Sequence, residues 1–109
     1  MRIAYAHDAV IASAGPDDAA PGAAVTVELC GSVPHEGPCP LAPHWTGAQR
    51  DGELLRLRIL FATEPEREAE VRRRIDAALA SDARWTPVSS GPGELRAAEA
   101  DHAARLVRS

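Results

Sequence analysis

The sequence contains no lysine and no asparagine, and aromatic residues make up only 4% of its 109 positions. All 12 basic residues are arginines, and 16 acidic residues outnumber them, giving a formal net charge of -4. Domains that bind nucleic acid usually carry a basic excess or a concentrated basic stripe, so we expect no nucleic-acid partner. The abundance of Ala, Arg, Gly and Pro matches GC-rich codons and indicates a bacterial source.

Long apolar runs are also missing. A membrane helix needs about 20 consecutive apolar residues, but the longest apolar stretch, 54–63, is interrupted by Arg56 and Arg58. No charged-then-apolar leader precedes His7. We therefore expect a cytoplasmic protein without a membrane partner, and the length predicts a single domain over 1–109.

The single basic run, Arg72–Arg74, follows a stretch rich in glutamate. On a helix, Glu68 would pair with Arg72 and Glu70 with Arg74, each four residues apart. The run therefore predicts a solvated helix face and not an anion-binding stripe.

Alternating apolar residues predict strands at 1–6, 24–30 and 54–62, and a short strand is expected at 84–89. The clearest is 54–62, with Leu55, Leu57, Ile59 and Phe61 on one face and Arg56, Arg58 and Leu60 on the other.

Helices are predicted at 64–81, with Thr63 as N-cap, and at 94–107. The result is a small α+β domain in the order β-β-β-α-β-α, with three to four strands and two helices packed on one face. It matches a ferredoxin-like sandwich incompletely, because that arrangement would need a helix near 8–14, where barely two turns fit.

Two long loops are expected. Residues 13–24 are small and polar, which predicts a loop that is free to move. Residues 31–50 contain four prolines and three glycines, which predicts a second loop. A loop of that length in a compact domain is usually functional or disordered.

The proline-rich loop region carries the most distinctive pattern, Cys30-x4-His35-x3-Cys39-x4-His44. Two thiolates and two imidazoles are the ligand set of a tetrahedral structural zinc site. Glu36 is a candidate further ligand or a hydrogen-bond acceptor for an imidazole. The leading hypothesis is therefore a small, non-enzymatic, zinc-binding protein of unknown pathway.

Other interpretations of the same residues stay open. The simplest is that Cys30 is an ordinary buried residue and the others are solvated loop residues. A disulfide or redox switch between Cys30 and Cys39 is another, and Cys39 as a nucleophile with His35 or His44 as its base is a third.

The competing hypothesis is a metal-free module that binds a protein or small ligand through the same loop and the exposed sheet face. Trp45 would then stack on the ligand, and Arg56 and Arg58 would face an acidic group. A simpler role for these arginines is pairing with Glu28 across the sheet. A homodimer contact through the last predicted helix, which carries His102, is also expected.

Overall fold

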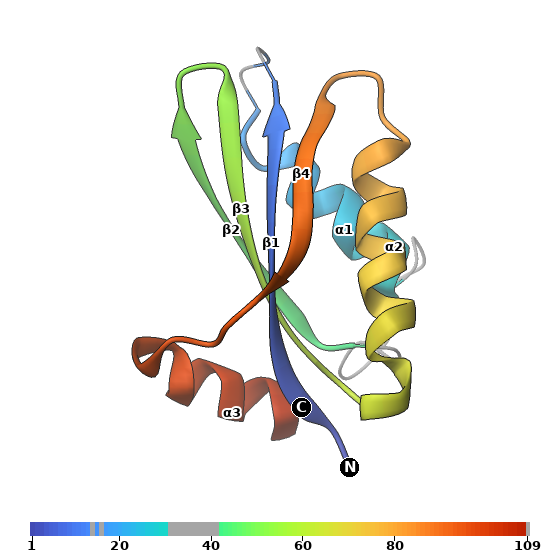
Figure 1. Cartoon of the computed structure of the whole chain (residues 1–109), viewed down its shortest axis with the longest axis vertical. Helices are drawn as coiled ribbons and strands as arrows, with labels where there is room; N and C mark the ends of the chain where they lie inside the picture. The colour runs from blue at the N-terminus through green and yellow to red at the C-terminus, as the bar shows by residue number, and fades with distance from the viewer. Residues whose placement is uncertain (14, 16, 31–41, 109) are drawn as a thin grey trace.

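The computed structural model describes residues 1–13, 15, 17–30 and 42–108, except for the side chain of Cys30. These residues form the following elements in chain order (Figure 1): β1 (Ile3–Ala12), α1 (Ala20–Cys30), β2 (His44–Asp51), β3 (Leu54–Thr63), α2 (Glu68–Ala80), β4 (Thr86–Gly93) and α3 (Ala100–Arg108). Short 3-10 turns at Pro65–Arg67 and Ala97–Glu99 lead into α2 and α3. No helix in these ranges is long and apolar enough to cross a membrane.

The four strands form one antiparallel sheet in the order β2-β3-β1-β4. The strands on either side of α1 are therefore parallel to each other with one strand between them, and the same holds for α2. This β-α-β-β-α-β arrangement is the ferredoxin-like sandwich. Helices α1 and α2 pack together on one face, and α3 lies across part of the other (Figure 1).

The α+β prediction, with a small sheet and two helices packed together on one face, is confirmed, but these helices are α1 and α2, and the predicted helix 94–107 lies on the opposite face as α3. One element was also assigned wrongly. The predicted strand 24–30 is part of helix α1. Val25 and Leu29 are four residues apart, so they share the buried face of a helix as readily as one face of a strand. This helix completes the ferredoxin-like order. It lies after residue 19 and not at 8–14, because β1 continues to Ala12.

Both predicted loops are shorter than expected. The last five residues of 13–24 belong to α1, and positions 44–50 of the loop 31–50 belong to β2. Strand β2 forms a hairpin with β3 through Gly52-Glu53, where Gly52 has a φ of 63°. Glycine at the first turn position is typical of the type II′ turn, which matches the twist of paired strands.

The helix starts also differ from the predictions. Thr63 is buried within β3 and is not an N-cap, and the chain enters α2 through the 3-10 turn that begins at Pro65. The helix predicted over 94–107 starts its regular turns only at Ala100. Residues near helix ends are the least determined by periodicity alone.

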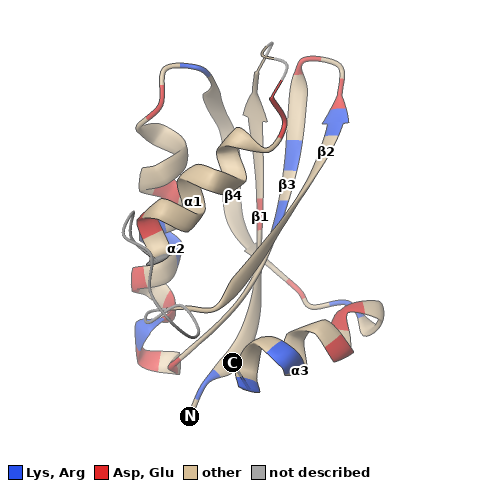
Figure 2. Ribbon diagram, turned by 180° about the vertical axis from the view of Figure 1, so that it is seen from behind, with Lys and Arg blue, Asp and Glu red and all other residues tan. Residues whose placement is uncertain are grey.

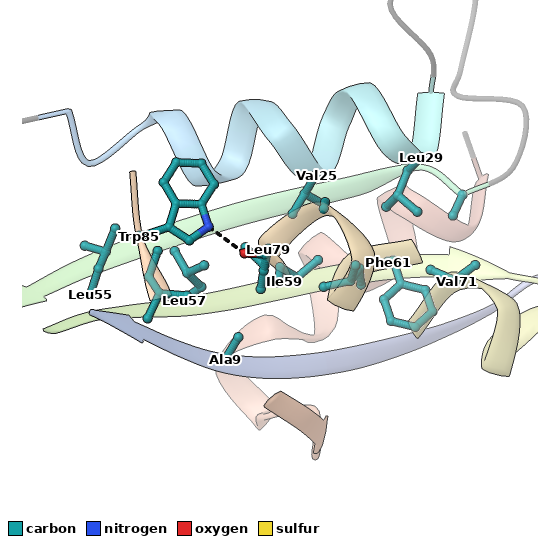
Figure 3. Packing of buried hydrophobic residues seen from close by; sticks show 14 residues of the cluster. Ala9, Val25, Leu29, Leu55, Leu57, Ile59, Phe61, Val71, Leu79 and Trp85 are labelled. Carbon is teal, nitrogen blue, oxygen red and sulfur yellow. Dashed lines mark hydrogen bonds between the residues drawn. The ribbon is translucent and has the colours of Figure 1, made fainter. Parts of the chain in front are cut away.

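The main core lies between the sheet and the pair α1 and α2 (Figure 3). Its centre is one face of β3, formed as predicted by Leu55, Leu57, Ile59 and Phe61, which are at most 2% exposed. The indole Nε1 of Trp85 donates a hydrogen bond to the Leu79 carbonyl oxygen at 2.8 Å, so this large side chain is buried with its polar atom satisfied.

A smaller apolar cluster lies on the opposite face, where Leu106 of α3 covers Ala6, Leu60 and Ala62. Helix α3 thus packs its apolar side against the sheet of its own chain. The homodimer contact expected through this helix stays a prediction. The remainder of this face, beyond α3, is open.

The predicted charge pairs of α2 are both present. Arg72 pairs with Glu68 at 2.8 Å, and Arg74 pairs with Glu70 at 3.4 Å. Figure 2 shows acidic and basic residues interspersed along this helix. Arg73 and Arg74 are exposed, whereas the side chain of Arg72 is only 14% exposed and also donates to the Ala6 carbonyl oxygen. The solvated helix face is therefore confirmed for Arg73 and Arg74 and not for Arg72.

Phe61 provides a direct test of the core. Replacing Phe61, which is fully buried and stacks on Tyr5 with ring centroids 5.4 Å apart, by alanine should lower the free energy of unfolding by about 3–5 kcal/mol. The measurement is urea denaturation followed by circular dichroism. The exposed Val88→Ala variant serves as control and should change the midpoint little. Equal effects of the two substitutions would contradict the described packing.

Candidate functional site

A groove of about 500 Å³ lies on the open face of the sheet, beside the segment that leads into α3. Its walls come from β1, β2, β3 and that segment, which are far apart in the sequence. The lining residues that carry polar or aromatic side chains are Asp8, Trp45, Gln49, Arg56, Arg58, Arg96 and Glu99. A cavity of this size is in the range of small-molecule sites.

Trp45 and Gly47 form one side of the groove. They stand two residues apart on β2 and share a face. A Cβ atom at Gly47 would lie only 2.5 Å from the ring of Trp45, so the indole lies directly over bare backbone. Trp45 is 43% exposed and contacts the ring of His102 edge-on, with centroids 5.2 Å apart. Glycine at position 47 thus allows the indole to form a flat surface beside the groove.

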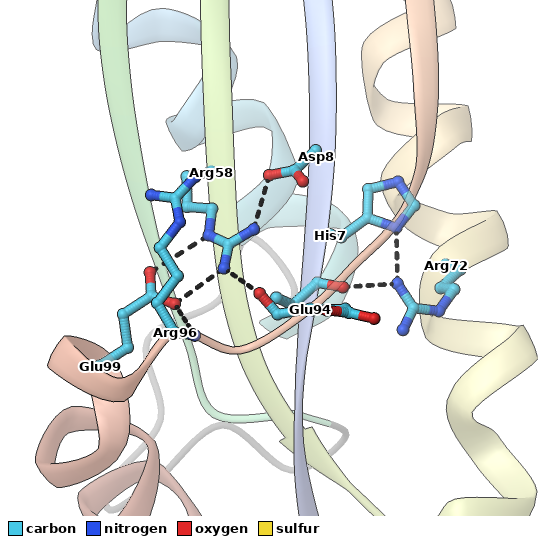
Figure 4. A network of polar contacts seen from close by, with 8 residues as sticks. His7, Asp8, Arg58, Arg72, Glu94, Arg96 and Glu99 are labelled. Atoms are coloured by element: carbon cyan, nitrogen blue, oxygen red, sulfur yellow. Dashed lines mark hydrogen bonds and ion pairs between the residues drawn. The ribbon is translucent and has the colours of Figure 1, made fainter.

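Arg58 lies at the centre of an ion-pair network (Figure 4). Its guanidinium donates to both carboxylate oxygens of Glu99, at 2.7 and 3.2 Å, and to Asp8 at 2.8 Å. It also donates to the backbone oxygen of Glu94. These contacts hold the segment before α3 against β1 and β3.

The network controls the charge states in the groove. Hydrogen bonds from Arg58 lower the pKa of Glu99 to about 2, and the same bonds raise the pKa of Arg58. Close approach of β4 completes the arrangement, because a Cβ atom at Gly93 would lie 2.3 Å from a carboxylate oxygen of Asp8. At neutral pH, Arg58 and Glu99 are therefore both ionised and bound to each other.

Arg56 and Arg96 also line the groove and are less engaged. Arg56 has a 58% exposed side chain and a single ion pair, to Asp51 at 3.6 Å. Arg96 makes no ion pair with any residue in the described part of the chain. The lining holds three arginines against two carboxylates, a local positive excess in a chain whose net charge is -4.

Glu99 is poorly suited to act as a general base. A general base works best when its pKa lies near the working pH, whereas Glu99 is held far below that range. The groove-lining residues of the described ranges include no histidine, cysteine, serine or tyrosine. What they offer a ligand is positive charge, a flat indole and the Gln49 amide.

The sequence-predicted metal residues are only partly visible. Cys30 is the last residue of α1, and His44 is the first residue of β2. His35, Glu36 and Cys39 lie outside the described residues. Within the described residues, no three His, Cys, Asp or Glu side chains are grouped as a metal site would require.

His44 lies on the helix side of β2, facing away from the groove. Its Nε2 is 2.9 Å from the hydroxyl of Thr26 on α1, and its Nδ1 is 3.1 Å from the carbonyl oxygen of Ala42. Burial lowers the pKa of His44, and the carbonyl contact opposes that shift. In a neutral ring, Nδ1–H donates to the Ala42 carbonyl oxygen. Nε2 is then the acceptor in the contact with Thr26.

The structure brings together three of the four residues expected to contact a ligand or partner, and the fourth, Glu36, lies outside the described residues. Trp45, Arg56 and Arg58 line the same groove. The expected pairing of these arginines with Glu28 is wrong, because Glu28 belongs to α1 on the opposite side of the sheet. Their actual carboxylate partners come from Asp8, Asp51 and Glu99.

A second polar cluster joins β1, α2 and β4. Buried His7 lies 3.0 Å from Arg72 through Nδ1 and 2.7 Å from the Ser90 hydroxyl through Nε2. Because Arg72 can only donate, Nδ1 accepts and Nε2–H donates to Ser90, which in turn donates to Asp76. Burial, followed by the charge of Arg72, lowers the pKa of His7. The chain of hydrogen bonds thus runs from Arg72 through His7 and Ser90 to Asp76 and ties α2 to β1 and β4.

Sequence reasoning missed Asp8, Arg96 and Glu99 as groove residues. Asp8 and Glu99 are separated from Arg58 by 50 and 41 positions, so no local spacing links them. One signal was available. Arg56 and Arg58 share a strand face with the apolar residue Leu60, which indicates that this face is partly buried. Buried arginines require carboxylate partners.

No family model and no curated protein matches this chain.

The Arg58–Glu99 pair predicts a specific pH dependence. Because the pKa of Glu99 is lower in the folded chain than in the unfolded chain, its contribution to stability is complete above about pH 5. That contribution should decline as the pH falls toward 2. In urea denaturation, Glu99→Gln should therefore be clearly less stable than the native protein at pH 7, with a smaller difference at pH 3.

The control is Glu66→Gln, since Glu66 is exposed on the turn before α2. It should show no comparable change with pH. A stability difference for Glu99→Gln that is the same at both pH values would contradict the proposed coupling.

Proposed function

We propose that this protein binds a small organic anion with a flat ring in the open-face groove, without transforming it. The observation that carries the proposal is the convergence of Trp45, Arg56 and Arg96 on one hollow of about 500 Å³. Each side chain offers a contact that an aromatic carboxylate or phosphate can use.

The charge of the groove favours an anion. Asp8 and Glu99 are both bound to Arg58, so they offer little attraction to a cation. Arg56 and Arg96 can direct N–H groups to a carboxylate or phosphate, which guanidinium recognises through paired hydrogen bonds. A cationic ligand would instead meet the excess of arginine.

The position of Trp45 favours a flat ligand. Its indole lies over the backbone at Gly47 and is partly open to solvent. Offset stacking of an aromatic ring on such a surface contributes beyond the area that it covers. The segment before α3 bounds the groove at Arg96 and Glu99, which favours a small molecule over a long chain.

Benzoate and phenyl phosphate are suitable probes, with benzylamine as a cation of similar shape. The expected result is that both anions, and not benzylamine, shift the indole N–H resonance of Trp45 in nuclear magnetic resonance titrations. Arg56→Gln and Arg96→Gln should each weaken the affinity by about tenfold, because each removes a charged hydrogen-bond donor.

Arg73→Gln is the matched control, since Arg73 is an exposed arginine on α2, away from the groove. It should leave the affinity for both anions unchanged. Equal loss in all three variants would indicate general electrostatic attraction and would contradict a built site. Failure of both anions to shift the Trp45 resonance would contradict the ligand class.

We also propose, as a second candidate, that the Cys/His segment binds zinc. The favouring observation is one of position: His44, at the start of β2, lies against Thr26 of the helix that ends at Cys30, and zinc would take the place of the Thr26 hydroxyl at Nε2. The chain therefore returns to α1 with His44 after leaving it at Cys30. The two outer members of the ligand pattern thus flank one short segment.

Metal content tests this second candidate. Protein purified without added metal or a histidine tag should contain about one zinc per chain, and a chelator should lower its melting temperature. Combined replacement of Cys30 and His44 by alanine should remove the metal, whereas His102→Ala should retain it. Metal-free protein whose melting is indifferent to zinc and chelator would overturn the proposal.

A further inference from the structure

Buried His7 lies where three elements of the fold meet. It belongs to β1, its Nδ1 contacts α2 and its Nε2 contacts β4, and the residue is 1% exposed. Imidazole is the side chain whose charge changes most readily near neutral pH. A proton that is taken up or released here therefore changes the charge inside a packed interface.

The neutral ring of His7 satisfies its neighbours in one arrangement. Nη1 of Arg72 is 3.0 Å from Nδ1 and can only donate, so Nδ1 is the acceptor. Nε2–H is then the donor to the Ser90 hydroxyl, 2.7 Å away, and this hydroxyl donates to Asp76. A proton added to the ring must bind to Nδ1, the atom that faces the guanidinium (Figure 4).

Several contacts hold Arg72 against β1 and the core. Its side chain is 14% exposed, and Nη1 also donates to the Ala6 carbonyl oxygen at 2.9 Å. Its guanidinium carbon lies 5.2 Å from the ring centroid of Phe61 and 5.8 Å from that of Tyr5. A cation in such a position is attracted by the aromatic rings. The same guanidinium also pairs at 2.8 Å with Glu68, which is 36% exposed.

The charges that face His7 come from α2: Arg72 disfavours a positive ring, whereas Asp76, with Oδ1 3.7 Å from Nε2, favours one. Asp76 is 55% exposed and is therefore screened by water and salt. The adjoining Asp8 of β1 lies on the opposite face of the sheet and pairs with Arg58. Burial, followed by the charge of Arg72, lowers the pKa of His7 in spite of the two carboxylates. The residues that β3 and β4 place next to His7 are uncharged: Ile59, Ser90 and Pro92.

We propose that His7 is an acid-sensitive switch that controls the position of Arg72 between α2 and β1. With a neutral ring, Nδ1 accepts from Arg72 and fastens α2 to β1. With a protonated ring, Nδ1–H and the guanidinium face each other as two positive donors, so Arg72 leaves the two aromatic rings. Glu68 keeps its ion pair with the displaced guanidinium, and Asp76 becomes the charged partner of the imidazolium.

The switch has a defined direction. Because the pKa of His7 is lower in the folded chain than in the unfolded chain, the unfolded chain takes up the proton first as the pH falls. The stability that the neutral contact provides is therefore complete well above about pH 6.5, the ordinary pKa of histidine, and it declines below that value. The Arg58–Glu99 pair is affected only at lower pH, since the pKa of Glu99 is about 2. The switch thus operates in mildly acidic solution, in a separate range.

Nitrogen-15 nuclear magnetic resonance of the imidazole rings, from about pH 8 to about pH 4.5, tests the proposal. The His7→Gln variant identifies the His7 signals, since the pKa of His44 is lowered as well. His7 should be the Nε2–H tautomer at high pH and should take up its second proton at a lower pH than histidine in a model peptide. The ring resonances of Tyr5 and Phe61 should shift with the same midpoint, because Arg72 leaves both rings in the same step.

Arg72→Gln keeps an N–H donor but removes the charge, so it should raise the protonation midpoint of His7 by at least about half a pH unit, which is about threefold in proton affinity. Arg73→Gln is the matched control, because Arg73 is exposed at the next position of α2, and it should leave the midpoint unchanged. Circular dichroism at about pH 8 should show both variants folded.

Two results would overturn the proposal. One is a His7 midpoint that Arg72→Gln leaves unchanged, or that Arg73→Gln raises by the same amount. The other is a native chain in which the ring resonances of Tyr5 and Phe61 stay constant while His7 takes up its proton. This second result decides the question even where Arg72→Gln fails to fold.

Discussion

The structure depends on the alternation of side chains along β3. This strand lies between β2 and β1, and its odd-numbered residues fill the core under α1 and α2. Its even-numbered residues face the other way, and there the chemistry changes along the strand. Leu60 and Ala62 bind α3 by apolar contact, whereas Arg56 and Arg58 require charged partners and line the groove. A one-residue shift in the register of β3 would bury both arginines in the core. It would also expose the four core residues of this strand, Leu55, Leu57, Ile59 and Phe61.

The fold class could be predicted because this alternation is strong and local. The same signal was misleading at 24–30, where three apolar residues at spacing two satisfied a strand template. A helix also buries Val25 and Leu29, and only the exposure of Val27 separates the two interpretations. The segment around His44 was misjudged for another reason. Its prolines stop at Pro43, and the strand that follows has few apolar residues because both of its faces are partly open.

The candidate site was predictable in its residue types and not in its geometry. Trp45, Arg56 and Arg58 were identified because an aromatic residue and two arginines outside the apolar stripe need an explanation. The groove itself depends on Glu99 and on the glycines at 47 and 93, which allow close approach of the indole and of the neighbouring strand. These close contacts arise only in the folded chain, and the local sequence pattern does not indicate them. His35, Glu36 and Cys39 lie outside the described residues, so the zinc pattern stays a prediction.

The contacts that hold α3 on the sheet also affect the affinity of the groove for a ligand. This helix buries only two of its own side chains, Ala103 and Leu106, and Arg58 secures the segment before it through Glu99 and Glu94. Elements with few buried contacts open more readily than the core of a domain. Opening of α3 would remove Glu99 from the groove wall and leave Asp8 as the carboxylate partner of Arg58. For the proposed ligand, affinity and helix docking are therefore linked: if docking of α3 changes the affinity by some factor, ligand binding changes the docking equilibrium by the same factor.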